Sequence, residues 1–182
     1  MRNLLILGAL ILFVAAPAMA QGGYEGSYPK AEVSGNYQYI RLNPGGSNCQ
    51  GGAGSVAGNL NSWFGVVGEF GGCKVTGQPS GTSAHLLNYL FGPRVTYRSY
   101  GRLQPFGHVL FGGERLSASA TGLGSASSNS FAMALGGGAD YYLRGHFTLR
   151  LIQVEYLYTH FGGVRQNNAR IEAGIVYHWG GR

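Results

Sequence analysis

Hydrophobic and polar residues alternate along most of this chain with a period of two. In residues 169–179, one side carries Ile171, Ala173, Ile175, Tyr177 and Trp179, and the other side is polar or small. A period of two predicts a β-strand whose two faces meet different environments.

The same alternation predicts eight strands. We place them at residues 32–42, 53–60, 63–75, 84–97, 104–116, 130–143, 147–159 and 169–179. The connections after the first, third, fifth and seventh strands are longer and polar, whereas the other three are short. An even number of antiparallel strands with this alternation of turns is typical of outer-membrane barrels. A soluble sandwich also has short, regularly spaced strands. The residue types on the two faces must therefore decide between a membrane barrel and a soluble sandwich.

The polar faces are made mainly of Gly, Ala, Ser and Asn, with a few isolated charges. A face exposed to water usually carries many Lys and Glu, whereas small residues suit the crowded interior of an eight-stranded barrel. Tyrosines on the apolar faces gather near the strand ends, as aromatic girdles do at membrane interfaces. We therefore predict an all-β fold, an eight-stranded antiparallel up-and-down transmembrane β-barrel with its apolar face toward lipid. A soluble lipocalin-like carrier, with apolar residues inside, is the alternative.

The N-terminal residues 1–20, MRNLLILGALILFVAAPAMA, have the pattern of a secretory signal peptide. A positive charge at Arg2 precedes an apolar run, and Ala18-Met19-Ala20 is a small-x-small cleavage site. The alternative is a membrane anchor, but the apolar run is short for the roughly 20 residues that a spanning helix needs. We predict cleavage after Ala20 and one barrel domain over residues 21–182.

Composition and charge agree with an exported β protein. The chain has 33 Gly and 12 Tyr with only 11% charged residues, and its net charge is +6. Few helix formers and many strand and turn residues exclude a helical fold. An exported protein seldom meets nucleic acid, so the basic balance favours anionic lipid head groups as the partner.

Several segments resemble strands of small eight-stranded outer-membrane barrels, the family that includes the transmembrane domain of outer membrane protein A. They are FGPRVTY, PFGHVLFGG, MALGGGADY and QVEYLYTHFGG, and the resemblance covers about residues 30–180. Gly174-x-x-Tyr177-x-Trp179 resembles the terminal strand that such barrels present to the barrel-assembly machinery. The resemblance implies a monomer in the outer membrane of the cell envelope. Three residues follow Trp179, which departs from the family's terminal-strand pattern. Longer relatives also carry a peptidoglycan-binding domain after the barrel, and this sequence does not.

Charged side chains on the polar faces are expected to point into the barrel. They are Glu69, Arg94, Glu114, Asp140, Glu155, Arg170 and Glu172. Lone buried charges are costly, so we expect them to pair and to form a network that plugs the lumen. The alternative is that some of them lie at the barrel mouths and are hydrated.

Two cysteines, Cys49 and Cys73, belong to a chain that is predicted to be exported, where disulfides persist. We place Cys49 in the first long loop and Cys73 near the outer end of the third strand. Both are then expected at the extracellular rim, and we predict a disulfide between them. Two free thiols are the alternative.

Four basic residues, Arg41, Lys74, Arg115 and Arg165, fall near the strand ends or loops that we place outside the cell. Lipopolysaccharide phosphates lie at that level, and Arg suits a bidentate grip on phosphate. We predict that these side chains contact lipid phosphate. Ordinary solubilising charge is the alternative.

The sequence offers no pattern that predicts catalysis, a cofactor or a metal site. The five histidines, His85, His108, His146, His160 and His178, lack the spacing of metal ligands. Outer-membrane lipid-A deacylases use His and Ser two residues apart on one strand, and no histidine here has that neighbour. The glycine-rich stretches lack the following helix or Lys-Ser/Thr of a nucleotide-binding loop.

We therefore predict a non-enzymatic outer-membrane barrel with a structural or surface-interaction role, a plugged lumen and extracellular loops. The alternatives are a narrow porin-like pore for small or apolar solutes and, third, a lipid-modifying enzyme.

Overall fold

A computed structural model of the chain shows one closed barrel of eight antiparallel strands, each paired with its neighbours in sequence and β1 paired with β8. The structure describes residues 28–180 except 44–45, 79–80, 99–100, 121, 123 and 162–163. The strands are β1 (Ala31–Arg41), β2 (Asn48–Asn59), β3 (Phe64–Thr76), β4 (Thr82–Thr96), β5 (Leu103–Ala120), β6 (Gly124–Arg144), β7 (Phe147–Phe161) and β8 (Val164–Trp179). The predicted fold class is confirmed, and the predicted signal peptide lies outside the described residues.

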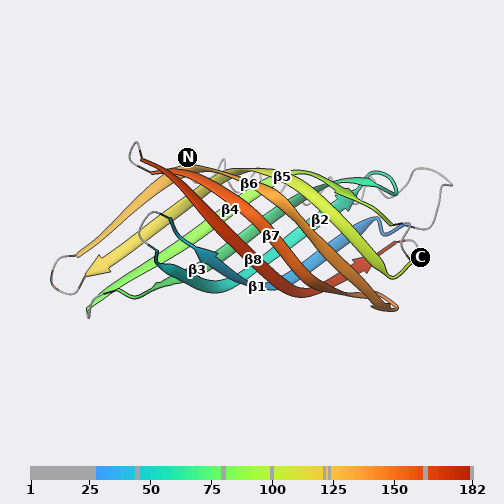
Figure 1. The fold of residues 1–182 in the computed structure, drawn as a ribbon, viewed down its shortest axis with the longest axis horizontal. Coiled ribbons are helices and arrows are strands. Elements are labelled where there is room, and N and C mark those ends of the chain that lie inside the picture. The colour runs from blue at the N-terminus through green and yellow to red at the C-terminus, as the bar shows by residue number, and fades with distance from the viewer. Residues whose placement is uncertain are drawn as a thin grey trace, which may run out of the picture.

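The two ends of the barrel differ, as Figure 1 shows. We call the end that holds Lys30 and Gly180 the inner end; the tight turns after β2, β4 and β6 lie there. We call the opposite end, with the connections after β1, β3, β5 and β7, the outer end. None of the described residues form a helix long and apolar enough to cross a membrane.

The outward face of the barrel is apolar, as the alternation predicts. In β4, Leu87, Phe91 and Val95 are exposed, whereas Asn88 and most other residues of opposite parity are buried. Exposed aromatic residues lie toward both ends of the barrel. Those toward the inner end include Trp63, Phe147, Tyr177 and Trp179, and those toward the outer end include Tyr37, Phe70, Tyr89, Phe131 and Tyr156. A lipid-facing band flanked by two aromatic girdles accounts for this distribution.

The strands extend further at the outer end than the sequence predicts. The strand predicted at 53–60 begins at Asn48, that predicted at 130–143 begins at Gly124, and that predicted at 169–179 begins at Val164. These extensions are rich in Ser, Gly and Asn and show no continuous apolar face. The extension of β6 is exposed on both sides, whereas those of β2 and β8 bury only Cys49 and Asn168. Their hydrogen-bonded ladders therefore continue without the hydrophobic alternation that marks the rest of each strand.

Three strands rise above the others at the outer end. The β5–β6 ladder continues to Ala120 and Gly124, and β4 stays paired with β5 as far as Thr82. The β6–β7 ladder, in contrast, reaches only Ala132. In Figure 1 the yellow ends of β5 and β6 therefore reach well beyond the blue and teal ends of β1 and β2. We call the raised part of β4–β6, at residues 82–86, 115–120 and 124–131, the wall.

Strand β7 contains one extra residue where Leu151 and Ile152 both face outward. The register shifts there against β6, between Ala139 and Asp140, and against β8, between Arg150 and Gln153. Such a bulge reverses the parity of every residue on its far side. As a result Arg150 points into the lumen, where simple alternation from Gln153 would have placed it outside.

Candidate functional site

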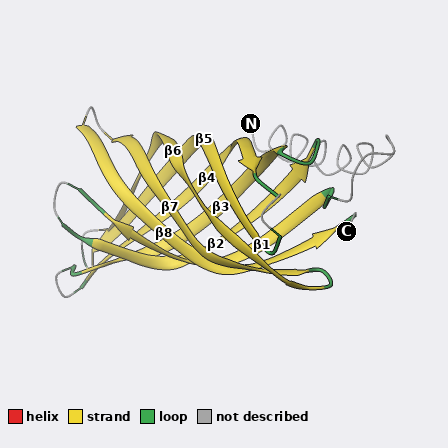
Figure 2. Cartoon of the chain, turned by 45° about the vertical axis from the view of Figure 1, so that its right-hand side comes forward, coloured by secondary structure: helices red, strands yellow, loops and turns green. Residues whose placement is uncertain are grey.

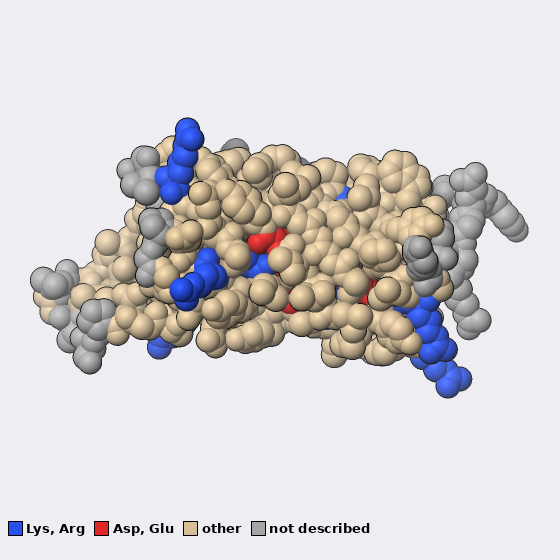
Figure 3. Space-filling view, in the orientation of Figure 1, with Lys and Arg blue, Asp and Glu red and all other residues tan. Residues whose placement is uncertain are grey.

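All the carboxylates of the described residues lie inside the barrel. Glu32, Glu69, Glu114, Asp140, Glu155 and Glu172 are at most 6% exposed. The outer surface carries basic side chains instead, at the two ends, and Figure 3 shows blue groups reaching out there with little red between them. The structure places all seven charges of the predicted lumen set inside, including Arg94 and Arg170.

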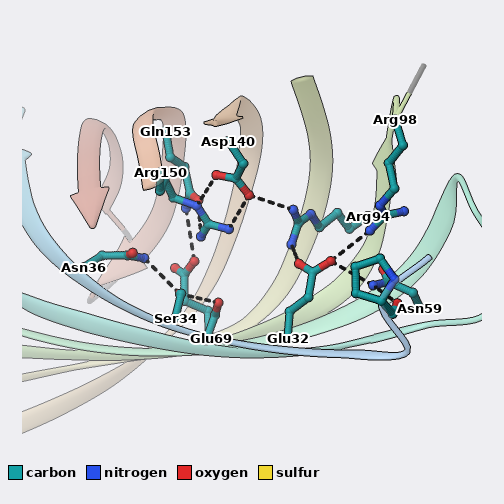
Figure 4. A network of polar contacts seen from close by, with 12 residues as sticks. Glu32, Ser34, Asn36, Asn59, Glu69, Arg94, Arg98, Asp140, Arg150 and Gln153 are labelled. Carbon is teal, nitrogen blue, oxygen red and sulfur yellow. Dashed lines mark hydrogen bonds and ion pairs between the residues drawn. The ribbon is translucent and has the colours of Figure 1, made fainter. Parts of the chain in front are cut away.

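One buried cluster lies toward the inner end, around Arg94. Its guanidinium donates to Glu32 at 2.8 Å and to Asp140 at 3.1 Å. Arg150 donates to the same Asp140 at 3.0 Å, and Arg98 donates to Glu32 at 2.8 Å. Figure 4 shows the chain of contacts crossing from β1 through β4 to β6 and β7. Three arginines and two carboxylates thus bridge the lumen, and each carboxylate has two basic partners.

A second cluster occupies the middle of the lumen, around Arg170. This guanidinium is fully buried and is ion-paired with Glu69, Glu155 and Glu172. His108 contacts the other oxygen of Glu155 at 2.5 Å. Carboxylates from β3, β7 and β8 therefore converge on one arginine, and His108 of β5 contacts one of these carboxylates.

The three carboxylates around Arg170 are close enough to hold a metal ion by distance alone. Oxygens of Glu69, Glu155 and Glu172 lie within 4.8 Å of one another. The Arg170 guanidinium lies among them, however, and makes the ion pairs that a metal would otherwise make. We therefore assign the cluster a structural role and not a metal-binding one.

Polar side chains around Arg170 fill the space left by inward glycines. A Cβ at Gly71 would lie 2.6 Å from Asn88 Oδ1, and one at Gly174 would lie 2.5 Å from Asn36 Oδ1. A Cβ at Gly136 would lie 2.6 Å from Glu155 Cγ. These three glycines thus allow larger neighbours to approach the wall and leave no continuous void at their positions.

An apolar layer occupies the lumen beyond Arg170, in the direction of the outer end. Ile40, Leu86, Leu90, Leu110 and Leu157 are at most 3% exposed and pack in one cluster. The sequence interpretation missed this layer, because it treated inward positions as polar or small. The sequence did contain a signal for this layer, because leucines occur at positions that alternation places on the inward face. The lumen therefore contains buried apolar side chains as well as ion pairs.

The predicted disulfide is present between Cys49 and Cys73. The predicted place of Cys49 in the first loop is wrong, because β2 already begins at Asn48. Both cysteines face inward and are buried in the apolar cluster, not at the rim. Gly51 lies opposite Cys73, and a Cβ there would lie 2.6 Å from the Cα of Cys73, so glycine allows the two strands to approach.

We expect the disulfide to stabilise the folded barrel. The bridge spans a sequence separation of 24 residues, and a loop of that length corresponds to about 3 kcal/mol in the chain-entropy estimate. Replacing Cys49 and Cys73 together with Ala should lower the free energy of unfolding in urea by about that amount. Peptide mapping without reductant should recover the linked pair from wild-type membranes, and finding both thiols free there would contradict the assignment.

Four charged or titratable residues of the lumen network were absent from the predicted set. Glu32 and His108 lie an even number of residues from inward-facing neighbours on the same strand. Alternation alone could therefore have placed both of them in the lumen. Arg150 was hidden by the bulge, for which the adjacent apolar pair Leu151-Ile152 was the only signal. Arg98 follows the end of β4, and no pattern in the sequence indicates that its side chain reaches Glu32.

The predicted assembly signal lies at the inner end of β8. Tyr177 and Trp179 are exposed and face outward, with their rings 5.2 Å apart, and Phe147 packs against Tyr177 at 5.4 Å. Gly174 faces inward, toward Asn36. The role of these residues in assembly stays a prediction.

Replacing Tyr177 and Trp179 together with Ser should reduce insertion into the outer membrane, because it removes the aromatic surface of the last strand. Deleting residues 180–182 should have a smaller effect. The measurement is the amount of folded, heat-modifiable barrel in outer-membrane fractions. Wild-type amounts in the double variant would refute the role of these side chains in assembly.

The four predicted phosphate contacts are all exposed near the outer end, but they fall into two groups. Lys74 on β3 and Arg115 on β5 flank β4, where His85 lies directly opposite Lys74. Arg41 on β1 and Arg165 on β8 lie on the other side of the barrel, and Arg41 donates to Asn48 Oδ1 at 2.7 Å. The structure therefore places the four residues at one end without bringing them into one site.

Comparison with solved structures shows the same fold in outer-membrane proteins of low identity. Neisserial surface protein A is 13% identical, with 82% of this chain and 96% of that one covered and a TM-score of 0.64. Ail of Yersinia pestis, in complex with the heparin analogue sucrose octasulfate, is 16% identical, with 84% and 100% covered and a TM-score of 0.54. OprG of Pseudomonas aeruginosa is 12% identical, with 85% and 97% covered and a TM-score of 0.50.

Comparison with curated protein sequences finds no match. The model of the outer membrane protein β-barrel domain, in contrast, matches residues 6–178, which is nearly the whole chain. With its closed eight-stranded barrel, apolar outer face and charged lumen, this chain belongs to the outer membrane protein β-barrel domain family, and its place is the outer membrane.

Proposed function

We propose that this protein is a non-conducting outer-membrane barrel that presents its raised wall at the cell surface. The observation that carries the proposal is the filled lumen. Arg94 and Arg170 each collect carboxylates from several strands, and the apolar layer around Leu90 and Leu110 lies next to them. A solute would have to break buried ion pairs and then pass the buried apolar side chains beside them.

The asymmetry of the outer end supports a surface-interaction role. Residues 124–131 of β6 stand beyond the last β6–β7 pair, and most of them are exposed. Eight residues of strand correspond to about 27 Å at about 3.4 Å per residue. Figure 2 shows from a second direction that the described residues form strands joined by loops around one barrel. Ail, which shares the fold, is described as an attachment invasion locus protein and in complex with a heparin analogue; this supports an extracellular contact role here.

A lipid-modifying enzyme is the less favoured alternative. His85 faces outward opposite Ser117 on the neighbouring strand. The backbone N–H of His160 donates to Ser130 Oγ at 2.9 Å, so a second histidine also lies beside a serine at the outer end. A histidine base is usually oriented by a third group such as a carboxylate. Every carboxylate of the described residues lies in the lumen, so His85 has no acidic partner on its own face.

Thiol labelling of intact cells tests the presentation of the wall. Ser125 is exposed on the wall, and Arg144 is exposed at the inner end. Cys49 and Cys73 form a disulfide and do not react. A membrane-impermeant maleimide should label Ser125→Cys in intact cells, and it should label Arg144→Cys only after the outer membrane is permeabilised. Labelling of Arg144→Cys alone in intact cells would overturn the proposed orientation.

A further inference from the structure

Two histidines lie next to each other at the inner end of the barrel, where β6 turns into β7 and β8 ends. His146 occupies the turn directly before Phe147, and His178 is the last residue but one of β8. The β7–β8 ladder pairs Phe147 with Tyr177. It continues by one residue, because the backbone N–H of His178 donates to the carbonyl of His146 at 2.9 Å. Spacing along the sequence gives no sign of this pair, since 32 positions separate the two residues.

One hydrogen bond fixes the tautomer of His146. Its Nδ1 lies 2.9 Å from the backbone carbonyl oxygen of His178, and a carbonyl oxygen only accepts, so Nδ1 carries the hydrogen. The other ring nitrogen, Nε2, keeps its lone pair and has no hydrogen-bond partner among the described residues. Histidine ligands of metal ions are commonly held in this way, with one ring N–H donated to a carbonyl or carboxylate. His146 is exposed, so an ion can approach its ring from water.

His178 is a buried imidazole without a hydrogen-bond partner. The residue is 7% exposed, and neither Nδ1 nor Nε2 of its ring is bonded to any of the described residues. The ring of Tyr142 lies 5.6 Å away, but its hydroxyl donates to the carbonyl of Gly145 at 2.8 Å. Buried polar side chains are nearly always hydrogen-bonded, so an unpaired imidazole calls for an explanation. An external partner would satisfy a nitrogen that the surrounding side chains leave unpaired.

The separation of the two rings suits one shared ion. Metal–nitrogen bonds of about 2.0–2.1 Å place the ring centres of two histidine ligands roughly 4.5–6.3 Å apart, depending on the angle at the metal. The ring centres of His146 and His178 are 6.1 Å apart. Glu32 lies opposite His178 on β1. Its two carboxylate oxygens are held by Arg94 and Arg98, so they are not free to bind an ion.

From these observations we propose that His146 and His178 form a binding site for a divalent transition-metal ion, with water completing its coordination. Imidazole nitrogen is a ligand for Zn²⁺ and Cu²⁺, whereas Mg²⁺ and Ca²⁺ prefer oxygen ligands. The bound ion links the β6–β7 turn to the last strand. It stabilises the closed barrel, because the two histidines meet only in the folded state. The inference depends on neither the wall nor its orientation, so its test is separate from that of the proposed function.

Electron paramagnetic resonance of the Cu²⁺ complex tests the site. The probe is Cu²⁺ alone, added at one equivalent to the purified protein without an affinity tag, in detergent micelles. Wild type should bind the ion with the hyperfine pattern of two nitrogen ligands. Excess Zn²⁺ should displace the Cu²⁺, whereas Mg²⁺ should not. His146→Gln and His178→Gln should each weaken Cu²⁺ binding by at least about tenfold and remove the two-nitrogen pattern, because each variant leaves only one imidazole.

A matched control removes two histidines elsewhere in the barrel. His85→Gln with His160→Gln changes two exposed residues at the outer end and should bind Cu²⁺ like wild type. Heat-modifiable mobility on gels verifies that each variant is folded. His146 lies in an exposed turn, so its variant tests the site even if a change at buried His178 prevents folding. The absence of a two-nitrogen spectrum from wild type, wild-type affinity in His146→Gln, or equal weakening by the outer-end control would rule the site out.

Discussion

Replacing Arg170 with Met is expected to destabilise the barrel by about 3–5 kcal/mol, because removing one partner of a buried ion pair leaves uncompensated charge. Arg170 is fully buried and is paired with Glu69, Glu155 and Glu172. Without it, the three carboxylates would repel one another in the middle of the lumen. The measurement is the free energy of unfolding in urea, followed by the mobility shift between folded and unfolded barrel on gels.

A matched control separates this effect from the loss of any arginine. Arg144→Met removes an exposed guanidinium at the inner end of β6 and should change the unfolding free energy by no more than about 0.5 kcal/mol. Adding Glu69→Gln and Glu155→Gln to Arg170→Met should restore part of the lost stability, since it removes the repulsion. An Arg170→Met barrel as stable as wild type would contradict the assignment of a central ion-pair cluster.

Replacing Phe91 with Lys is expected to have the second-largest effect. Phe91 is 63% exposed on the outward face of β4, opposite Phe111 of β5. A Lys on the lipid face near the bilayer midplane costs about 2–4 kcal/mol. The measurement is the unfolding free energy of the barrel folded into lipid vesicles.

Ser127→Lys is the control for this substitution. Ser127 is exposed on the wall, where water is available to solvate an ammonium group. Its substitution should change stability by no more than about 0.5 kcal/mol. Equal tolerance of Lys at Phe91 and at Ser127 would mean that the apolar face of β4 does not meet lipid.

Alternation alone was enough to predict the fold and most of the lumen. In the last strand, Arg170 and Glu172 fall on one parity and Ile171 and Ile175 on the other, and the structure has the first pair buried and the second exposed. The prediction succeeds because lipid and a crowded lumen demand opposite side chains at successive positions. Which charges pair with which could not be predicted, since the pairs join strands distant in sequence, such as Arg94 with Asp140.

The failures of the sequence interpretation have identifiable physical causes. The bulge at Leu151 moved Arg150 into the lumen, and a rule based on a strict period of two cannot anticipate an extra residue. The outer parts of β2, β6 and β8 were predicted as loops because they consist mainly of Gly, Ser, Asn and Gln and lack alternating apolar residues. That error also put Cys49 in a loop, although its disulfide to Cys73 was predicted correctly.

His85 shows a further limit of single-residue inspection. Taken alone it is a histidine without ligand spacing, and the sequence analysis gave it no role. Only the register places it opposite Lys74 and next to Ser117. The four basic residues predicted to contact phosphate lie at the outer end in two separate groups, and their contact with phosphate stays a prediction.

Electrical recording from the purified barrel in planar lipid bilayers tests the closed lumen most directly. Buried ion pairs around Arg94 and Arg170, together with apolar side chains such as Leu90 and Leu110, occupy the lumen. We therefore expect no steady single-channel conductance from wild type in salt solution, with an established porin as the positive control. Stable conductance steps in wild type that change when Glu69 or Glu155 is replaced by Gln would contradict this account and would show the lumen to be a pore.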